Sequence, residues 1–380
     1  MSLISADTVV LEQGLCRPGW VETSAGQIVG CGSGLPPRQP DVDMPDALVV
    51  PGFVDIHVHG GGGASYTDGD DADILRAAMF HRGHGTTTSV ASLVTAPPAE
   101  LLTAVRVLAD STRAGAVAGV HLEGPWLSAA HCGAHDPAHL RDAVPGEIDA
   151  LLGTGGGAIR MVTLAPERAG SSDAISRFVD AGVVVAVGHT DATYEQTRHA
   201  VELGATVGTH IFNAMRPVHH REPGPALALL EDARVTVELI ADGVHVHPAM
   251  QRAVIEAAGA DRVALVTDAT AAAGLGDGEY RLGAVQIDVV GRVARVHGTS
   301  TIAGSTATMD QLFRAAAGLG SDRDAALAAA VQMTATTPAR TLGLDNVGRL
   351  RAGADANLVV LDRDLQVSAV MADGEWQTGS

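Results

Sequence analysis

His57 and His59 stand one residue apart in the segment PGFVDIHVHG, which is rich in residues that favour β-strands. Side chains alternate between the two faces of a strand, so both imidazoles are expected to point to the same face. Two imidazoles on one face can bind one metal ion. The pair alone is a weak signal, because a histidine at the end of a strand is more often structural, and a metal site needs further ligands.

Other potential ligands follow from the expected secondary structure. Short segments rich in Val, Ile and Leu alternate with segments of helical period, a pattern typical of parallel strands joined by helices. The predicted strands are residues 49–56, 86–92, 117–122, 159–164, 183–188, 206–210, 235–240 and 263–267. Eight such strands predict an α/β fold with a closed (β/α)8 barrel of the TIM type, and an open doubly wound sheet is the alternative.

Histidine and acidic side chains gather at the C-terminal ends of these strands, where barrel enzymes build their active sites. They are His57, His59, His121, Glu123, His189, His210 and Asp268. Imidazole and carboxylate ligands suit Zn²⁺ and other divalent transition metals, which polarise a carbonyl group and activate water. Asp268 is the candidate general base, because it could take a proton from water and return it to a leaving nitrogen. A helix cap or a simple ligand is the alternative for Asp268.

The composition excludes several other classes of protein. The formal net charge is −19 and no basic run occurs, so a nucleic-acid partner is not expected. All 25 basic residues are arginine, which excludes Schiff-base chemistry and a carboxylated lysine between two metals. Three cysteines are too few for a disulfide framework, and neither a signal peptide nor an apolar run long enough to cross a bilayer is found. We therefore expect a cytoplasmic protein without a membrane partner.

The two ends of the chain differ from its middle. Residues 1–50 and 345–380 contain short β-rich segments with glycine turns and no helical period, so we expect them to pair into one small β-sandwich domain. Residues 51–344 are expected to form the catalytic barrel. Residues 277–303 follow the last predicted barrel strand and have the pattern of a β-hairpin insertion.

Together these motifs resemble the amidohydrolase superfamily, in which a metal-binding barrel is joined to a small β domain. Within it, the chain is similar to the N-acetylglucosamine-6-phosphate deacetylase family. The resemblance covers essentially the whole chain, with the motifs in the family's order: PGFVDIHVHG, HLEGPW, GAHDP, GHTDAT, THIFNAM, REPG, LIADGVHVHP, LVTDAT and GRLRAGADANLVVLD.

The resemblance implies a role for each matching residue. Glu123, His189 and His210 would bind one metal, and Asp268 would act as general base and then as acid. The expected substrate-binding residues are His135, which also stabilises the reacting carbonyl, His245 near the sugar and amide, Asn213 and Ala214 at the phosphate, and Ile302 and Ala303 at the acetyl pocket. Arg221 in REPG would reach the phosphate in the neighbouring active site, which implies a homodimer.

The expected reaction is metal-dependent hydrolysis of N-acetyl-D-glucosamine 6-phosphate to D-glucosamine 6-phosphate and acetate. One alternative is deacetylation of the galactosamine epimer, and another is a different amidohydrolase reaction. The phosphate motif REPG argues against unphosphorylated substrates, and the missing lysine argues against the branch that uses a carboxylated lysine. A sugar-phosphate sensor without catalytic activity is the remaining alternative, from a different class of protein.

The histidine pair also bears on the number of metals. Some members of the resembled family lack the two first-strand histidines and work with one metal. This chain keeps both, and without lysine the group left to bridge two metals is Glu123. We predict two divalent metals per chain, with Glu123 shared and the second metal on His57, His59 and Asp268. Zinc is the expected metal, with iron, manganese or cobalt as alternatives.

Overall fold

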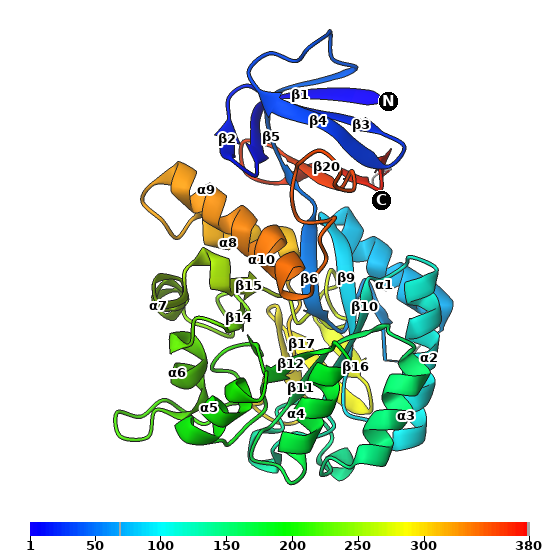
Figure 1. The fold of residues 1–380 in the computed structure, drawn as a ribbon, viewed down its shortest axis with the longest axis vertical. Helices are drawn as coiled ribbons and strands as arrows, with labels where there is room; N and C mark the ends of the chain where they lie inside the picture. Colours follow the sequence, from blue (N-terminus) through cyan, green and yellow to red (C-terminus); the bar gives the residue numbers. More distant parts are fainter. Residues whose placement is uncertain (68–69, 378–380) are drawn as a thin grey trace. The chain divides into compact units, whose positions relative to one another are not determined.

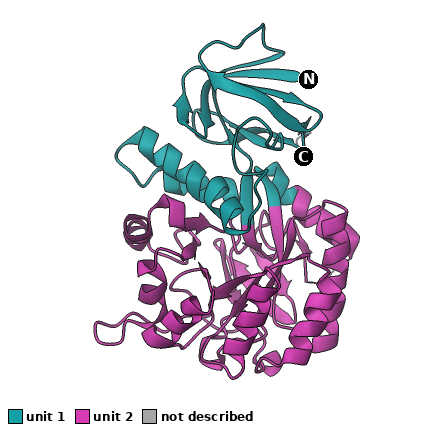
Figure 2. Cartoon of the chain, viewed as in Figure 1, with its two compact units in different colours: residues 1–55, 80–88, 308–380 teal, residues 56–79, 89–307 magenta. Residues whose placement is uncertain are grey.

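The structure, a computed structural model, describes residues 1–67 and 70–377. Its contacts divide the chain into two compact units, which Figure 2 shows in different colours. One unit comprises residues 1–55, 80–88 and 308–380, and the other comprises residues 56–79 and 89–307. The expected domain boundaries, at residues 50 and 345, stay a prediction.

Both ends of the chain form one sheet in the first unit. The N-terminal segment contributes β1 (Ser2–Leu11), β2 (Gly14–Cys16), β3 (Gly19–Ser24), β4 (Gln27–Ser33) and β5 (Val42–Pro51). The C-terminal segment contributes β19 (Leu358–Leu361), β20 (Val367–Ala372) and β21 (Glu375–Trp376). The order is β21-β20-β19-β5-β1-β3-β4, with β2 paired to β1. Strand β5 joins the two ends, since it runs parallel to β1 and antiparallel to β19. The expected pairing of the ends is confirmed.

Helices complete the first unit. They are α8 (Met309–Ala317), α9 (Arg323–Val331), a π-helical turn (Gln332–Thr336) and α10 (Thr337–Thr341). The Phe313 ring on α8 packs against Phe53, with ring centroids 5.3 Å apart. Arg17 forms two parallel hydrogen bonds of 2.6 Å with the Asp324 carboxylate on α9.

The barrel strands follow one another around the sheet in chain order. They are β6 (Phe53–Val58), β9 (Thr86–Leu93), β10 (Gly119–Glu123), β11 (Ile159–Leu164), β12 (Val184–Val187), β13 (Val207–Gly208), β14 (Thr236–Leu239) and β15 (Val263–Leu265). The pairs from β9 to β15 are parallel. Between them the chain forms α1 (Asp71–Gly83), α2 (Pro98–Arg113), α3 (Pro145–Gly155), α4 (Ser171–Asp180), α5 (Tyr194–Glu202), α6 (Gly224–Glu231) and α7 (Pro248–Ala258). Helices α2 to α6 lie on the outside of these strands (Figure 1).

Main-chain hydrogen bonds just beyond the last strand close the ring of strands. Asp268 N–H donates to the carbonyl oxygen of His57 at 2.9 Å, and His59 N–H donates to that of Ala269 at 2.8 Å. The segment after β15 therefore joins the end of β6, and the (β/α)8 barrel expected from the sequence is confirmed. The closure brings His57, His59 and Asp268 to the same place.

The first predicted strand, residues 49–56, is wrong in one respect: it consists of two strands in two sheets. Strand β5 ends at Pro51 and β6 begins at Phe53. Gly52 lies between them, and its N–H donates to the carbonyl oxygen of Asn357 at 2.9 Å. A Cβ atom at Gly52 would lie 2.1 Å from Thr87 Oγ1, so a larger residue does not fit at this passage.

The insertion expected after the last barrel strand is present. Strands β16 (Gly278–Leu282), β17 (Val285–Val290) and β18 (Val293–Val296) form an antiparallel three-stranded sheet. Ile287 and Ala294 from this sheet pack with Val94 and Ala303 in one buried cluster. Across residues 1–67 and 70–377, no helix has both the length and the apolar character that crossing a membrane requires.

Candidate metal centre

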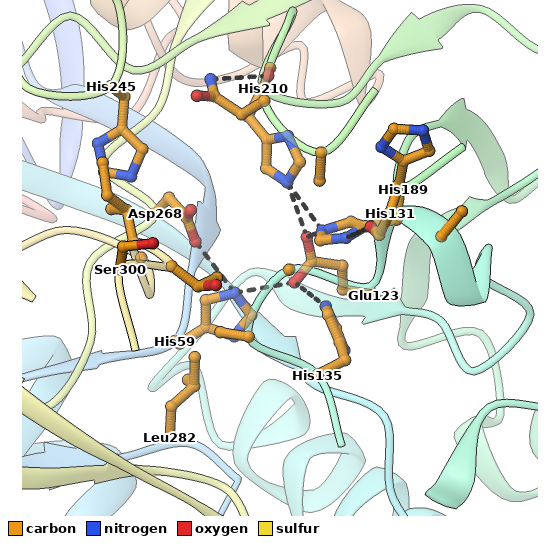
Figure 3. Close-up of a pocket in the computed structure, with 18 residues that line it drawn as sticks. His59, Glu123, His131, His135, His189, His210, His245, Asp268, Leu282 and Ser300 are labelled. Atoms are coloured by element: carbon orange, nitrogen blue, oxygen red, sulfur yellow. Dashed lines mark hydrogen bonds and ion pairs between the residues drawn. The ribbon is translucent and has the colours of Figure 1, made fainter. Parts of the chain in front are cut away.

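The C-terminal ends of the barrel strands enclose a cavity of about 430 Å³. Its lining includes ten residues expected from the sequence, among them His59, Glu123, His135, His189, His210 and Asp268. In Figure 3, His59, His135 and His210 point toward the Glu123 carboxylate from different elements, and Asp268 approaches His59. The site is therefore assembled around one buried carboxylate at the end of β10.

One group of potential ligands consists of His189, His210 and Glu123. His189 Nε2 and His210 Nε2 lie 3.0 and 3.1 Å from Glu123 Oε1, and the two nitrogens are 3.1 Å apart. Ligand atoms bound to one tetrahedral zinc at about 2.0–2.1 Å lie about 3.3 Å from one another. The three atoms therefore have nearly the spacing that a metal ion requires. Both histidines have positive φ, +47° and +25°, at the turns that aim the rings inward.

A second group consists of His57, His59 and Asp268 beside Glu123. His59 Nε2 lies 3.2 Å from Glu123 Oε2, 3.2 Å from Asp268 Oδ1 and 3.2 Å from His57 Nε2. His57 Nε2 lies 3.4 Å from Glu123 Oε1 and 3.6 Å from Asp268 Oδ1. Glu123 thus belongs to both groups of potential metal ligands found in the described residues.

Hydrogen bonds to the Nδ1 atoms of the imidazoles determine which tautomer each ring adopts and whether its Nε2 can bind a metal. His59 Nδ1 lies 3.2 Å from the carbonyl oxygen of Ser92, and His189 Nδ1 lies 2.9 Å from that of His131. A carbonyl oxygen only accepts, so Nδ1 carries the hydrogen and Nε2 of the neutral ring has a lone pair. His57 Nδ1 likewise donates to the Glu238 carboxylate at 2.9 Å. The lone pairs of the neutral His57 and His59 rings would face each other at 3.2 Å, and a proton on one ring or a bound cation would relieve their repulsion.

The pKa shifts at this site also indicate that its buried carboxylates favour nearby positive charge. Burial lowers the pKa of His59, but hydrogen bonds to Asp268 and Glu123 outweigh burial and raise that pKa to about 9. Burial raises the pKa of Glu123, but the surrounding imidazoles, His57 first, outweigh burial and hold that pKa well below its usual range. The carboxylates of this cluster thus favour positive charge among the imidazoles. The donor set fits a divalent metal of the zinc type.

His135 differs from the other histidines around Glu123. Its Nδ1 accepts a hydrogen bond of 3.2 Å from the main-chain N–H of Thr95, so the hydrogen of the neutral ring is on Nε2. Nε2 lies 3.3 Å from Glu123 Oε2. Burial, the largest cause, lowers the pKa of His135 to about 4. The ring is therefore a neutral hydrogen-bond donor on the wall of the cavity.

His245 is fixed by a carboxylate. Asp242 Oδ2 accepts from His245 Nδ1 at 2.8 Å, and Asp242 Oδ1 accepts from the main-chain N–H groups of Val244 and His245. Burial lowers the pKa of His245, but the hydrogen bond to Asp242 outweighs burial, so the pKa is raised. In Figure 3, His245 lies on the side of Asp268 away from Glu123, and both line the cavity.

The remaining predicted substrate residues lie in different places. Asn213, Ala214 and Ile302 line the cavity. Ala303 is fully buried beside the cavity lining, in a cluster with Val94 and Ile287. Arg221 is exposed, and its guanidinium lies 2.6 Å from His220 Nε2. It is not part of the cavity lining of its own chain, as far as residues 1–67 and 70–377 are concerned.

His121 does not join either ligand group, although the sequence placed it among the strand-end residues. Its Nδ1 lies 2.9 Å from Ser92 Oγ and its Nε2 lies 2.8 Å from Thr163 Oγ1, so hydroxyl groups occupy both nitrogens. His121 precedes Glu123 by two residues on β10 and points to the same face. The strand rise therefore puts it about 6–7 Å deeper in the barrel.

Two residues of the site were missed from the sequence. His131 lines the cavity and its carbonyl oxygen holds His189. Glu238 on β14 is completely buried and holds His57. A signal for Glu238 was present, because a carboxylate in the middle of the apolar run VTVELI must have a partner when buried.

Comparisons with known proteins agree with this geometry. The amidohydrolase family model matches residues 48–377. An N-acetylglucosamine-6-phosphate deacetylase of Danio rerio is 38% identical over 88% of this chain and 85% of its own. An N-acetylgalactosamine-6-phosphate deacetylase of Escherichia coli O157:H7 is 36% identical over 95% and 96%. Among solved structures, a mutant N-acetyl-D-glucosamine-6-phosphate deacetylase of Mycobacterium smegmatis, in complex with N-acetyl-D-glucosamine-6-phosphate, is 57% identical. It covers 99% of this chain and 98% of its own, with a TM-score of 0.97.

Proposed function

The chain belongs to the amidohydrolase family of metal-dependent hydrolases, and we propose that it hydrolyses the acetamide group of N-acetyl-D-glucosamine 6-phosphate. The products would be D-glucosamine 6-phosphate and acetate. The observation that carries this proposal is the set of buried imidazoles around the shared Glu123 carboxylate in the cavity. Further support comes from relatives that match most of the chain and are named as deacetylases of amino-sugar phosphates.

We propose two divalent metals per chain, with zinc as the expected metal and iron, manganese or cobalt as alternatives. His189, His210 and Glu123 would hold one, and His57, His59 and Asp268 would hold the other together with Glu123. The support is that Glu123 belongs to both ligand groups. A metal held by these residues would polarise the acetamide carbonyl and lower the pKa of a bound water.

Two side chains of this cavity would carry the proton and stabilise the developing charge. The Asp268 carboxylate would accept a proton from the attacking water and deliver it to the departing nitrogen. His135 Nε2–H would donate a hydrogen bond to the carbonyl oxygen as negative charge develops there. The main-chain hydrogen bond from Thr95 supports this role, because it keeps the hydrogen of His135 on the nitrogen nearest Glu123.

The phosphate and sugar would be held by other residues of the cavity lining. His245, oriented by Asp242, would contact the sugar and the reacting amide, and Asn213 and Ala214 would contact the phosphate. We propose that Arg221 reaches the phosphate in the site of a second copy, in a homodimer. Its exposure, and its position outside the cavity lining of its own chain, support this arrangement. The cytoplasmic location expected from the sequence stays a prediction, which fractionation of the source cells would test.

The galactosamine epimer is the second candidate substrate, because a relative that is 36% identical is named as its deacetylase. Both substrates offer the same acetamide and the same phosphate to the residues described above. They differ at one ring hydroxyl, so discrimination would arise from the sugar contacts rather than from the metal centre.

Acetate release tests the proposed function. Zinc-loaded protein would be assayed with N-acetyl-glucosamine 6-phosphate, N-acetyl-galactosamine 6-phosphate and unphosphorylated N-acetyl-glucosamine. We expect the highest kcat/KM with the glucosamine 6-phosphate, and acetate release that is lost in Asp268→Asn. Higher kcat/KM with the galactosamine epimer would favour the second candidate. Binding of the sugar phosphates without acetate release would overturn the proposal and indicate a sensor.

A further inference from the structure

Glu238 is a buried carboxylate that the proposed reaction does not use. It lies on β14 in the barrel interior and has no exposed surface. Its Oε2 accepts from His57 Nδ1 at 2.9 Å and from the main-chain N–H of His210 at 3.2 Å. Its Oε1 has no hydrogen-bond partner among the described residues. One carboxylate oxygen therefore holds one residue of each ligand group.

The contact with His57 determines which nitrogen of that ring faces the centre. Because the carboxylate accepts from Nδ1, the lone pair of the neutral ring is on Nε2, which lies 3.2 Å from His59 Nε2. A carboxylate behind an imidazole ligand also makes that ligand more basic. Without Glu238, the His57 ring could take the other tautomer or rotate, and the second ligand group would lose its geometry.

The charge of Glu238 supports the same conclusion. Glu123, Asp268 and Glu238 are three carboxylates within one buried cluster. Their side-chain partners there are imidazoles, and buried anions with such partners favour the binding of cations. A single divalent metal would leave part of this negative charge unbalanced, and a second divalent metal would offset it.

We propose that Glu238 is a positioning residue for the second metal: it fixes His57 with Nε2 toward the centre and supplies charge that favours a cation on His57 and His59. This inference rests on the proposed two-metal deacetylase. It assigns Glu238 no contact with substrate, so its removal should change metal affinity first and KM for the sugar phosphate little.

The chain offers a matched control in Asp242. Asp242 Oδ2 accepts from His245 Nδ1 at 2.8 Å, just as Glu238 Oε2 accepts from His57 Nδ1, and Asp242 follows Glu238 by four residues. His245, however, belongs to neither ligand group. Asp242→Asn should therefore leave the metal content unchanged and raise KM, whereas Glu238→Gln should weaken one metal and leave KM unchanged.

The test is equilibrium dialysis of metal-free protein against buffered Zn²⁺, with the bound zinc per chain measured by mass spectrometry. For Glu238→Gln, which keeps the shape of the side chain, we expect the Kd of the weaker zinc to rise about 10- to 100-fold. The Kd of the other zinc should change by less than about 3-fold, because glutamine keeps an oxygen that can accept from the main-chain N–H of His210. His59→Asn should lose the same zinc, which identifies the affected site. Glu238→Asp, which keeps the charge but is shorter, provides a second variant if Glu238→Gln does not fold.

The outcomes separate the inference from the proposal on which it rests. The inference alone would be overturned if the unmodified protein bound two zincs and both folded Glu238 variants kept the Kd of the second zinc unchanged. One zinc in the unmodified protein would overturn the two-metal centre, and the inference with it. Acetate release by the unmodified protein, measured in the same samples, tests the deacetylase function independently. Recovery of kcat in Glu238→Gln at high Zn²⁺, with KM unchanged, would support the positioning role.

Discussion

Two buried carboxylates with histidine neighbours, Asp310 and Glu123, illustrate how a structural cluster differs from a metal site. Asp310 accepts from Thr308 Oγ1 at 2.5 Å and from the Arg314 guanidinium at 2.8 Å, and it lies 3.3 Å from His84 Nδ1. Glu123 is surrounded instead by imidazole nitrogens, at 3.0 to 3.4 Å.

The difference lies in the supply of positive charge. Burial raises the pKa of Asp310, but hydrogen bonds from His84, Thr308 and Arg314 outweigh burial and lower that pKa to about 2. A permanent cation on Arg314 completes that cluster. At Glu123 the neighbours are imidazoles, whose positive charge is not permanent but depends on a bound proton or a nearby metal. A carboxylate that lacks a permanent cation among several inward-facing imidazoles is therefore the mark of the metal centre.

Among the tests of this comparison, removal of the metals should have the largest effect on activity. A chelator should reduce acetate release to background, and Zn²⁺ should restore it. The chelator should also lower Tm, because a ligand at 1,000 times its Kd stabilises the folded state by about 4 kcal/mol. Asp310→Asn should respond to the chelator in the same way as the unmodified protein, since its cluster needs no metal. Full activity after complete metal removal, verified by mass spectrometry, would contradict the comparison.

Asp268→Asn tests the proton-transfer role within the centre. The amide cannot accept the proton of the attacking water, so kcat should fall about 10²- to 10⁴-fold. The measurement is acetate release at saturating substrate, with zinc content determined in parallel. A loss of kcat below tenfold would show that another group moves the proton.

His135→Ala removes the neutral donor near Glu123. We expect kcat to fall about 10²- to 10³-fold, because a donor to the developing oxyanion is lost, while zinc content stays the same. His245→Ala provides the comparison, because its side chain should contribute to KM more than to kcat. Steady-state kinetics at several substrate concentrations separate the two effects. If both variants raised KM equally and left kcat unchanged, the role of His135 would be rejected.

Asp310→Asn should have the smallest effect on activity and a measurable effect on stability. The pKa of Asp310 is lowered on folding, so its contribution is present above the unfolded pKa of about 4 and is lost as pH falls toward 2. We expect the variant to lose about 1–3 kcal/mol of unfolding free energy at pH 7. Urea denaturation at pH 7 and pH 3 should show a smaller difference at pH 3. A difference that grows with acidity would contradict this account.

The residues and their spacing were sufficient to predict the barrel and the meeting of the candidate ligands, because strand alternation and the parallel order determine where His57, His59, Glu123, His189, His210 and Asp268 lie. The same residues and spacing were insufficient to predict how deep in the barrel each side chain lies. His121 shares a face with Glu123 but lies one layer deeper, and the hydroxyls that occupy it come from other strands.

Contacts between residues far apart in the sequence account for the other features that the sequence analysis did not predict. The break between β5 and β6 lies at Gly52, where Thr87 leaves no room for a Cβ atom, and no local pattern reveals this contact. Glu238 was overlooked because its partner His57 is 181 residues away in the sequence. The role proposed for Arg221 would depend on a second copy of the chain, so a single sequence can suggest it only through resemblance to a family.

The most direct test of the central claim is the number of metals per chain at saturation, measured together with acetate release from N-acetyl-glucosamine 6-phosphate. The account predicts two metals in the unmodified protein. It predicts one metal and a clearly reduced kcat in the double variant His57→Gln/His59→Asn. One metal per chain in the unmodified protein, with full activity retained in the double variant, would contradict the shared role of Glu123.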